Sequence, residues 1–121
     1  MIDNTIFDEL SSLNGYMGAV LSDYTGEVLV SDTNNITKLD ETSMRFNEDF
    51  RNLHDVTRKL GLGHTKNLNL QAGNANIVMT CGGSNHRNHL HAFVILDEHG
   101  SAPLAKIALE SVLEKAIASL G

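Results

Sequence analysis

The chain of 121 residues has a mass of 13.2 kDa, and 41% of its residues are hydrophobic while 5% are aromatic. This composition excludes a disordered polar chain, a collagen-like repeat and a coiled coil, and the length predicts one domain over residues 1–121 that buries about two-thirds of its unfolded surface. The formal net charge of -6, with no cluster of lysine and arginine, disfavours a surface for nucleic acid or an anionic membrane.

Cysteine content and the first residues indicate the compartment. Cys81 is the only cysteine, so no disulfide can form within one chain, which is typical of a reducing compartment. Residues 1–5 lack the basic segment and the long apolar stretch of a signal peptide, and no segment holds the ~20 apolar residues that span a bilayer. We therefore expect a cytoplasmic protein that neither inserts into a membrane nor binds nucleic acid.

Apolar spacing predicts a short helix and a hairpin at the start of the chain. Apolar residues recur at helical spacing over residues 2–13, and the Asn-Gly pair that follows is a natural stop. Two apolar runs, residues 16–21 and 27–31, flank a turn over residues 23–26 that ends in glycine. Two short runs around such a turn predict a β-hairpin.

The strongest helical pattern covers residues 39–60. Thr37 or Asp40 is suited to cap its start, and Gly61 and Gly63 are suited to end it. One stripe of the helix, expected to face the core, consists of Leu39, Phe46, Phe50, Leu53, Thr57 and Leu60.

Three strands and a final helix follow. Residues 66–71 alternate polar and apolar, residues 76–81 form a second run, and residues 92–96 are apolar on both faces, as expected of a central strand. The short, half-polar first strand of the three is suited to the edge of a sheet. A helix is expected over residues 102–120, with Ser101 as its N-cap and a proline in its first turn.

These elements follow in the order α-β-β-α-β-β-β-α. A five-stranded antiparallel sheet with helices on both faces is the simplest packing that buries every apolar stripe. We therefore predict an α+β fold in which the sheet is sandwiched by helices.

The opening of the chain resembles that of a known family. Residues 13–23 read LNGYMGAVLSD, and Gly26 and the run VLVS at residues 28–31 follow. This pattern is similar to the opening of the Roadblock family, the dynein-light-chain-like domains that are also found as GTPase regulators in bacteria and archaea. The long helix, its terminating glycines, the three strands and the closing helix follow in family order. The resemblance implies a Roadblock/profilin-like fold.

The resemblance also implies a function. It implies a non-enzymatic homodimer whose paired long helices form a docking platform for a small Ras-like GTPase, which the dimer regulates or scaffolds. The alternative is an assembly module, akin to the light chains of motor or signalling complexes, with no effect on a nucleotide cycle. Contacts with the second copy or the partner are expected at Met44, Arg45, Glu48, Asp49, Asn52, Asp55, Val56, Lys59, Asn67 and Asn69.

Cysteine and histidine residues gather around a glycine-rich loop that departs from the family pattern. Cys81 ends a strand, and His86, His89 and His91 follow it closely. Thiolate and imidazole groups are zinc ligands, so metal sensing through this loop is a further, weaker alternative. Because the spacing matches no established zinc pattern, the sequence favours solvated loop histidines beside a buried thiol. The remaining histidines are expected to be scattered singly, without a role: His54, His64 and His99.

No pattern of catalytic residues is found. The sequence lacks a G-x-S-x-G elbow, and its glycine-rich segments lack the lysine and the following helix of a phosphate-binding loop. We therefore expect no catalytic residue, no cofactor and no enzymatic activity.

Overall fold

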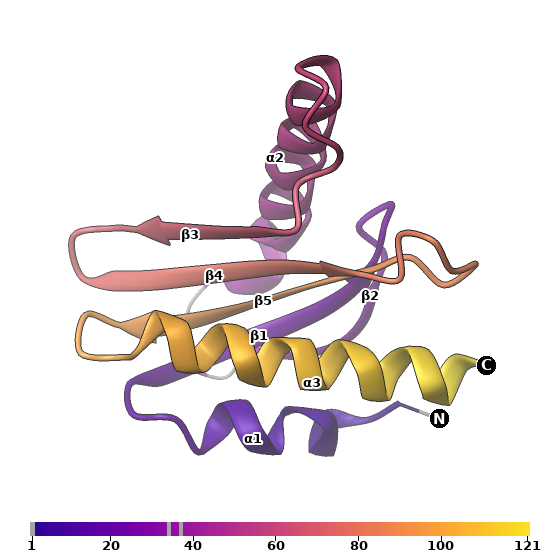
Figure 1. Cartoon of the computed structure of the whole chain (residues 1–121). Coiled ribbons are helices and arrows are strands. Elements are labelled where there is room, and N and C mark those ends of the chain that lie inside the picture. Colours follow the sequence, from indigo (N-terminus) through magenta and orange to yellow (C-terminus); the bar gives the residue numbers. More distant parts are fainter. Residues whose placement is uncertain (1, 34, 37) are drawn as a thin grey trace.

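The computed structural model describes residues 2–33, 35–36 and 38–121, and within these ranges the strands form one antiparallel sheet (Figure 1). Its strands are β1 (Tyr16–Asp23), β2 (Val28–Asp32), β3 (Asn67–Gln71), β4 (Ala75–Gly82) and β5 (Leu90–Asp97). Across this five-stranded sheet the order is β2-β1-β5-β4-β3, so β5 is central and β3 is an edge strand. The predicted α+β class and the predicted order of elements are confirmed.

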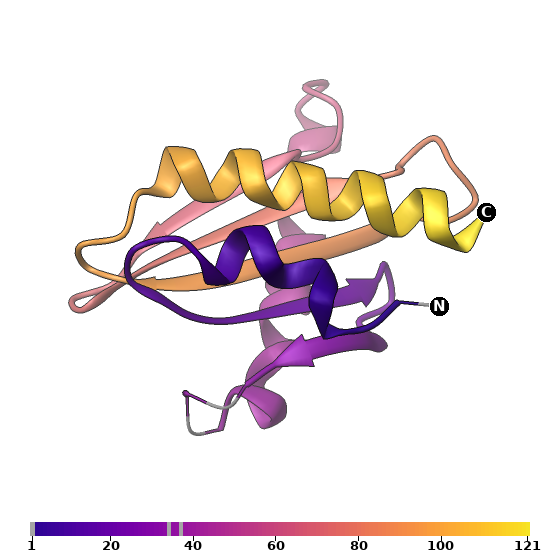
Figure 2. The same ribbon diagram turned by 90° about the horizontal axis from the view of Figure 1, so that it is seen from below.

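One face of the sheet is covered by both ends of the chain. The closing helix α3 (Ala102–Leu120) lies beside a short N-terminal segment, which consists of the 3-10 helix η1 (Asn4–Phe7) and helix α1 (Asp8–Ser11) (Figure 2). The single helix predicted over residues 2–13 is therefore shorter and divided. The Ser12 hydroxyl donates to the Glu9 carbonyl at 2.8 Å, a local bond that competes with continuation of the helix.

The long helix α2 (Leu39–Lys59) covers the opposite face. It starts after Lys38, whose φ is 70° and whose side chain forms no capping hydrogen bond. The predicted caps cannot be assigned, because Thr37 and the side chain of Asp40 lie outside the described residues. The apolar layer beneath α2 contains Val20, Leu39, Phe50, Ile77, Met79, Phe93 and Ile95.

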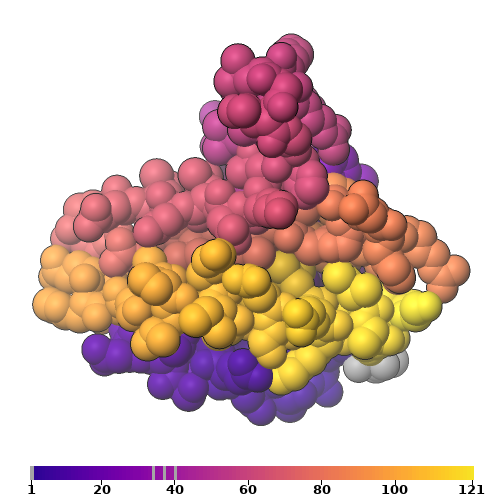
Figure 3. Space-filling model, viewed as in Figure 1, coloured from indigo at the N-terminus to yellow at the C-terminus, as the bar shows by residue number. Residues whose placement is uncertain are grey.

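The C-terminal half of α2 projects beyond the edge strand β3 and rises from the body of the molecule (Figures 1 and 3). This arrangement corrects the predicted core-facing stripe. Leu39 and Phe50 are buried, but Leu53 is 36% exposed and Leu60 is 67% exposed. Because the helix overhangs the sheet, its last turns have no strand beneath them.

The hairpin between β1 and β2 is held by its turn. The Asp23 carboxylate accepts hydrogen bonds from the backbone nitrogens of Thr25 (2.9 Å) and Glu27 (3.0 Å). Gly26 has a φ of 99°, a conformation that other residues adopt only with strain.

At the C-terminal end of α2, Gly61 and Gly63 have positive φ and end the helix as predicted.

Among the described residues, no helix combines the length and the apolar character needed to cross a membrane.

Candidate functional site

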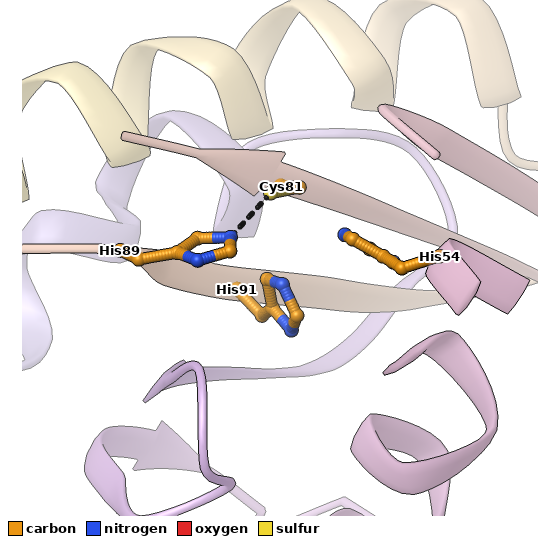
Figure 4. A group of neighbouring side chains, drawn as sticks. All are labelled: His54, Cys81, His89 and His91. Atoms are coloured by element: carbon orange, nitrogen blue, oxygen red, sulfur yellow. Dashed lines mark hydrogen bonds between the residues drawn. The ribbon is translucent and has the colours of Figure 1, made fainter. Parts of the chain in front are cut away.

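Three histidines and the single cysteine meet between α2 and the sheet. They are His54 of α2, Cys81 of β4, His89 just before β5, and His91 of β5 (Figure 4). One nitrogen or sulfur atom from each lies within 4.8 Å of the corresponding atom of every other member. We call these four residues the His-Cys cluster.

The sheet and α2 place the cluster by simple geometry. Cys81 and His91 are directly paired across β4 and β5, so their side chains lie on the same face. His54 follows Phe50 by one helical turn, on the side of α2 that faces the sheet. His54 and His91 are buried, whereas Cys81 and His89 are half-buried.

Hydrogen bonds fix the orientation of two of the rings. His54 Nδ1 lies 2.8 Å from the Phe50 carbonyl oxygen, which can only accept. His91 Nδ1 lies 2.7 Å from Oδ1 of the buried Asn47, whose Nδ2 donates to the Tyr24 carbonyl at 3.1 Å. Both histidines therefore carry their proton on Nδ1.

The remaining nitrogen of each of these rings points into the cluster. Among the described residues, neither His54 Nε2 nor His91 Nε2 has a hydrogen-bond partner, although both are buried. Cys81 Sγ lies 2.9 Å from His89 Nε2. The centre of the cluster thus holds two unpaired nitrogens and one sulfur–nitrogen contact.

Burial favours the uncharged form of all four groups by shifting their pKa values. It lowers the pKa of His91 to about 3, and the neighbouring His54 and His89 add to the effect. It lowers the pKa of His54 and His89 as well, and it raises the pKa of the Cys81 thiol to about 11. Neutral imidazole is the form of histidine that binds metal ions.

The cluster differs in membership from the sequence expectation. Cys81, His89 and His91 belong to it, but His86 is exposed and instead accepts a hydrogen bond from the Asn88 nitrogen at 3.0 Å. The prediction that His54 stands alone is wrong, because His54 belongs to the cluster. Its position one turn after Phe50 indicates from the sequence that His54 is buried, but not which residues it meets.

The sequence also predicted that His64 and His99 stand alone, and only His99 lies away from the cluster. The His64 ring stacks on that of His54 at a centroid distance of 5.8 Å, so His64 lies next to the cluster. His99 is exposed in the turn after β5, with its Nε2 3.8 Å from a Glu98 carboxylate oxygen.

The exposed surface of α2 has two sides of different character. On one side, Leu53, Val56 and Leu60 follow one another at helical spacing, and Val56 is 51% exposed. We call these three residues the apolar flank. The sequence prediction included Val56 but assigned its two neighbours to the core.

The other side is polar. Glu48, Asn52 and Asp55 line a hollow of about 340 Å³ together with Tyr24 and Arg51. The Arg51 guanidinium carbon lies 4.8 Å from the centroid of the Tyr24 ring, so this arginine is held by a cation-π contact. The polar hollow brings together three of the residues predicted to contact a partner.

The remaining predicted contact residues are distributed over α2 and β3. Arg45 and Asp49 form an exposed ion pair of 3.6 Å beside the apolar flank, and Met44 is 53% exposed near the start of the helix. The others are exposed in the last turn of α2 or on the edge strand: Lys59, Asn67 and Asn69. Their roles in binding stay predictions.

Known proteins match this chain in structure but not in sequence. No protein-family model and no curated protein matches the sequence. Solved structures match the fold over almost the whole chain. Myxococcus xanthus MglB has a TM-score of 0.79 at 17% identity, and the match covers 97% of this chain and 93% of that chain.

Two further structures are similar. An MglB with a tetrameric arrangement has a TM-score of 0.79 at 17% identity, covering 95% of this chain and 86% of that chain. A Roadblock/LC7 domain from Streptomyces avermitilis has a TM-score of 0.79 at 11% identity, covering 93% of this chain and 92% of that chain. The resemblance seen in the sequence is therefore confirmed as a likeness of fold, and this chain has the fold of a Roadblock domain.

Proposed function

We propose that this protein is a non-enzymatic homodimer that regulates or scaffolds a small Ras-like GTPase, with the paired α2 helices as the docking platform. The observation that carries the proposal is the apolar flank, an uncovered apolar surface on the projecting half of α2, in a chain with the Roadblock fold.

The apolar flank supports self-association. Leu53, Val56 and Leu60 are 36%, 51% and 67% exposed and lie on one side of a helix that overhangs the sheet. Contiguous exposed apolar surface of this kind marks interaction sites. A second copy is a suitable occupant, because two α2 helices related by a two-fold axis would each cover the flank of the other.

The edge of the sheet supports the same mode of association. Within the described residues, β3 pairs only with β4, which leaves its outer backbone groups available for another strand. No proline interrupts β3. Because β3 and the overhanging part of α2 lie next to each other, one second copy can use both surfaces.

The outer side of the helix pair would then face a partner. Glu48, Asn52 and Asp55 line the polar hollow of each copy, and pairing through the apolar flank leaves this side uncovered. The hollow holds two carboxylates against the single guanidinium of Arg51, and the chain has a net charge of -6, so this side favours a partner with a basic patch, which it would attract over long range. Such a platform acts by holding one conformation of the partner and shifting its populations.

The regulator and the assembly module differ in one assay. Small Ras-like GTPases from the same organism are loaded with GTP. The rates of GTP hydrolysis and of nucleotide exchange are then measured with and without this protein. A changed rate that the substitutions Glu48→Lys and Asp55→Lys abolish supports regulation. Binding without any rate change identifies an assembly module instead. Failure of every GTPase to bind in either nucleotide state contradicts both forms of the proposal.

A further inference from the structure

We propose that the His-Cys cluster is a zinc-binding site, with His54, Cys81, His89 and His91 as the four protein ligands. The site lies on the inner side of α2 and goes beyond the proposed function. It differs from the loop site considered from the sequence, because a helix residue, His54, takes the place of His86.

Within the described part of the chain, two buried nitrogens without hydrogen-bond partners point to a metal ion at the centre of the cluster. Burying a nitrogen without a hydrogen-bond partner is unfavourable, yet His54 Nε2 and His91 Nε2 are both buried in this way. The ligand atoms that the four residues offer lie within 4.8 Å of one another. Native proteins contain few such groups, and an ion bound between them is a recognised reason for their presence. A cation at the centre of the cluster satisfies both lone pairs at once.

The partners of the outer nitrogens are those of metal-binding histidines. The Phe50 carbonyl and Asn47 Oδ1 accept from the two Nδ1–H groups, which directs both Nε2 lone pairs inward. Metal-bound histidines almost always donate their second N–H to a carbonyl or carboxylate in this way. Asn47 is itself fixed by its bond to the Tyr24 carbonyl, so the orientation of His91 is set before any metal arrives.

The spacing and the donor set fit zinc. Zinc–nitrogen bonds of about 2.0–2.1 Å and zinc–sulfur bonds of about 2.3 Å place tetrahedral ligand atoms roughly 3.3–3.6 Å apart. The four atoms lie within 4.8 Å of one another, and the Cys81–His89 pair is 2.9 Å apart. Side-chain adjustments of about an ångström therefore close the set around one ion. Three imidazoles and a thiolate favour zinc over magnesium or calcium, which select oxygen ligands.

Binding requires one proton to leave. The Cys81 thiol becomes a thiolate when it bonds to zinc, its proton passes to solvent, and the three imidazoles bind through nitrogens that carry no proton. Cys81 also lines a hollow of about 440 Å³ with His64 and Lys66, which gives the ion a route from solvent.

The site would fasten α2 to the sheet. His54 belongs to α2, whereas the other three ligands belong to β4, to β5 and to the residue before β5. Bound zinc would add a direct link between the helix that carries the apolar flank and the strands beneath it. Zinc removal is therefore expected to lower the thermal stability of the protein.

The test uses the full chain, with its thiol kept reduced and its metal removed by a chelator. Titration with Zn²⁺ alone is expected to saturate at one ion per chain and to raise the Tm by roughly 10 °C when free zinc is a hundredfold above the Kd. Co²⁺ as the probe is expected to give the intense visible bands of a tetrahedral site and a near-ultraviolet thiolate-to-cobalt band.

Substitutions distinguish this site from adventitious binding. Cys81→Ser is expected to abolish the thiolate-to-cobalt band, and His91→Asn to abolish stoichiometric binding. Asn47→Leu is expected to weaken zinc affinity by about 10–100-fold, as loss of a hydrogen-bonded support for a ligand does. The matched controls His86→Asn and His99→Asn lie outside the cluster and are expected to bind like the unchanged chain.

Three results would overturn the proposal. They are the absence of Zn²⁺ binding at one ion per chain, an octahedral cobalt spectrum, and a spectrum that Cys81→Ser leaves unchanged while His86→Asn removes it. If His91→Asn does not fold by circular dichroism, Cys81→Ser decides alone, since its side chain is half-buried and nearly isosteric with the original.

Discussion

Replacing Val56 by aspartate tests the apolar flank most sharply. Val56 is 51% exposed at the middle of the flank, between Leu53 and Leu60. Burying an apolar side chain completely contributes about 1.5–3 kcal/mol, so the exposed half of Val56 contributes roughly 1 kcal/mol on association. A two-fold interface contains this side chain twice, which makes the loss about 2 kcal/mol before any cost of burying a carboxylate.

That loss corresponds to a dimer Kd that rises at least roughly 30-fold. Sedimentation velocity over a range of concentrations measures it. The matched control is Ile107→Asp, which places the same charge at a 65% exposed apolar position on the opposite side of the sheet. The control is expected to leave the Kd unchanged, and both variants are expected to fold, because neither side chain belongs to the core.

Two outcomes would refute this reasoning. The first is a Val56→Asp chain that dimerises as tightly as the unchanged chain. The second is an equal loss of affinity in Ile107→Asp, which would assign the interface to α3 or attribute the effect to net charge alone.

Three predictions concern the scaffold. Gly26→Ala is expected to lower the free energy of unfolding in urea by about 1–2 kcal/mol, because its φ is 99°; an unchanged midpoint would contradict the strain. Leu109→Ala is expected to lower the free energy of unfolding by about 2–5 kcal/mol, since Leu109 is fully buried. A loss below about 1 kcal/mol would contradict this, because the core would then have collapsed into the space that the side chain leaves. Burial raises the pKa of Asp23, but hydrogen bonds from Thr25, Glu27 and Gly26 outweigh it, so the pKa is lowered overall.

The sign of the Asp23 effect follows from linkage. The unfolded chain binds this proton more readily, so the stabilisation is complete above the ordinary pKa of about 4 and is lost as the pH falls through the lowered value. The difference in free energy of unfolding between the unchanged chain and Asp23→Asn is therefore expected to shrink below pH ~4. Urea unfolding at several pH values measures it, and a difference independent of pH would be evidence against a charged Asp23 in the turn.

Local patterns were sufficient to predict most of the fold. Alternation and turn residues identified every strand of the sheet to within a few residues, and β5 was recognised as central because its residues are apolar on both faces. The N-terminal helix was predicted too long. It ends at Ser11, where the hydroxyls of two serines donate hydrogen bonds to the backbone carbonyls of Asp8 and Glu9.

Tertiary placement decided the parts that sequence could not predict. Leu53 and Leu60 share a stripe with buried residues, but how far α2 extends past β3 determines whether a strand lies beneath them. His54 has no sequence neighbour among the cluster residues, and only the packing of α2 on β4 and β5 brings it to Cys81 and His91. Periodicity gives the face of a helix, whereas the residues opposite that face depend on the whole sheet.

The central claim is that the paired α2 helices form a platform for a small Ras-like GTPase, and titration calorimetry tests it most directly. Purified small Ras-like GTPases from the same organism, loaded with GDP or with a non-hydrolysable GTP analogue, are titrated into this protein. The account predicts that at least one binds with an affinity that depends on the nucleotide, and that Glu48→Lys with Asp55→Lys weakens this binding without changing the dimer. Affinities that these substitutions leave unchanged, or no binding in either nucleotide state, would contradict it.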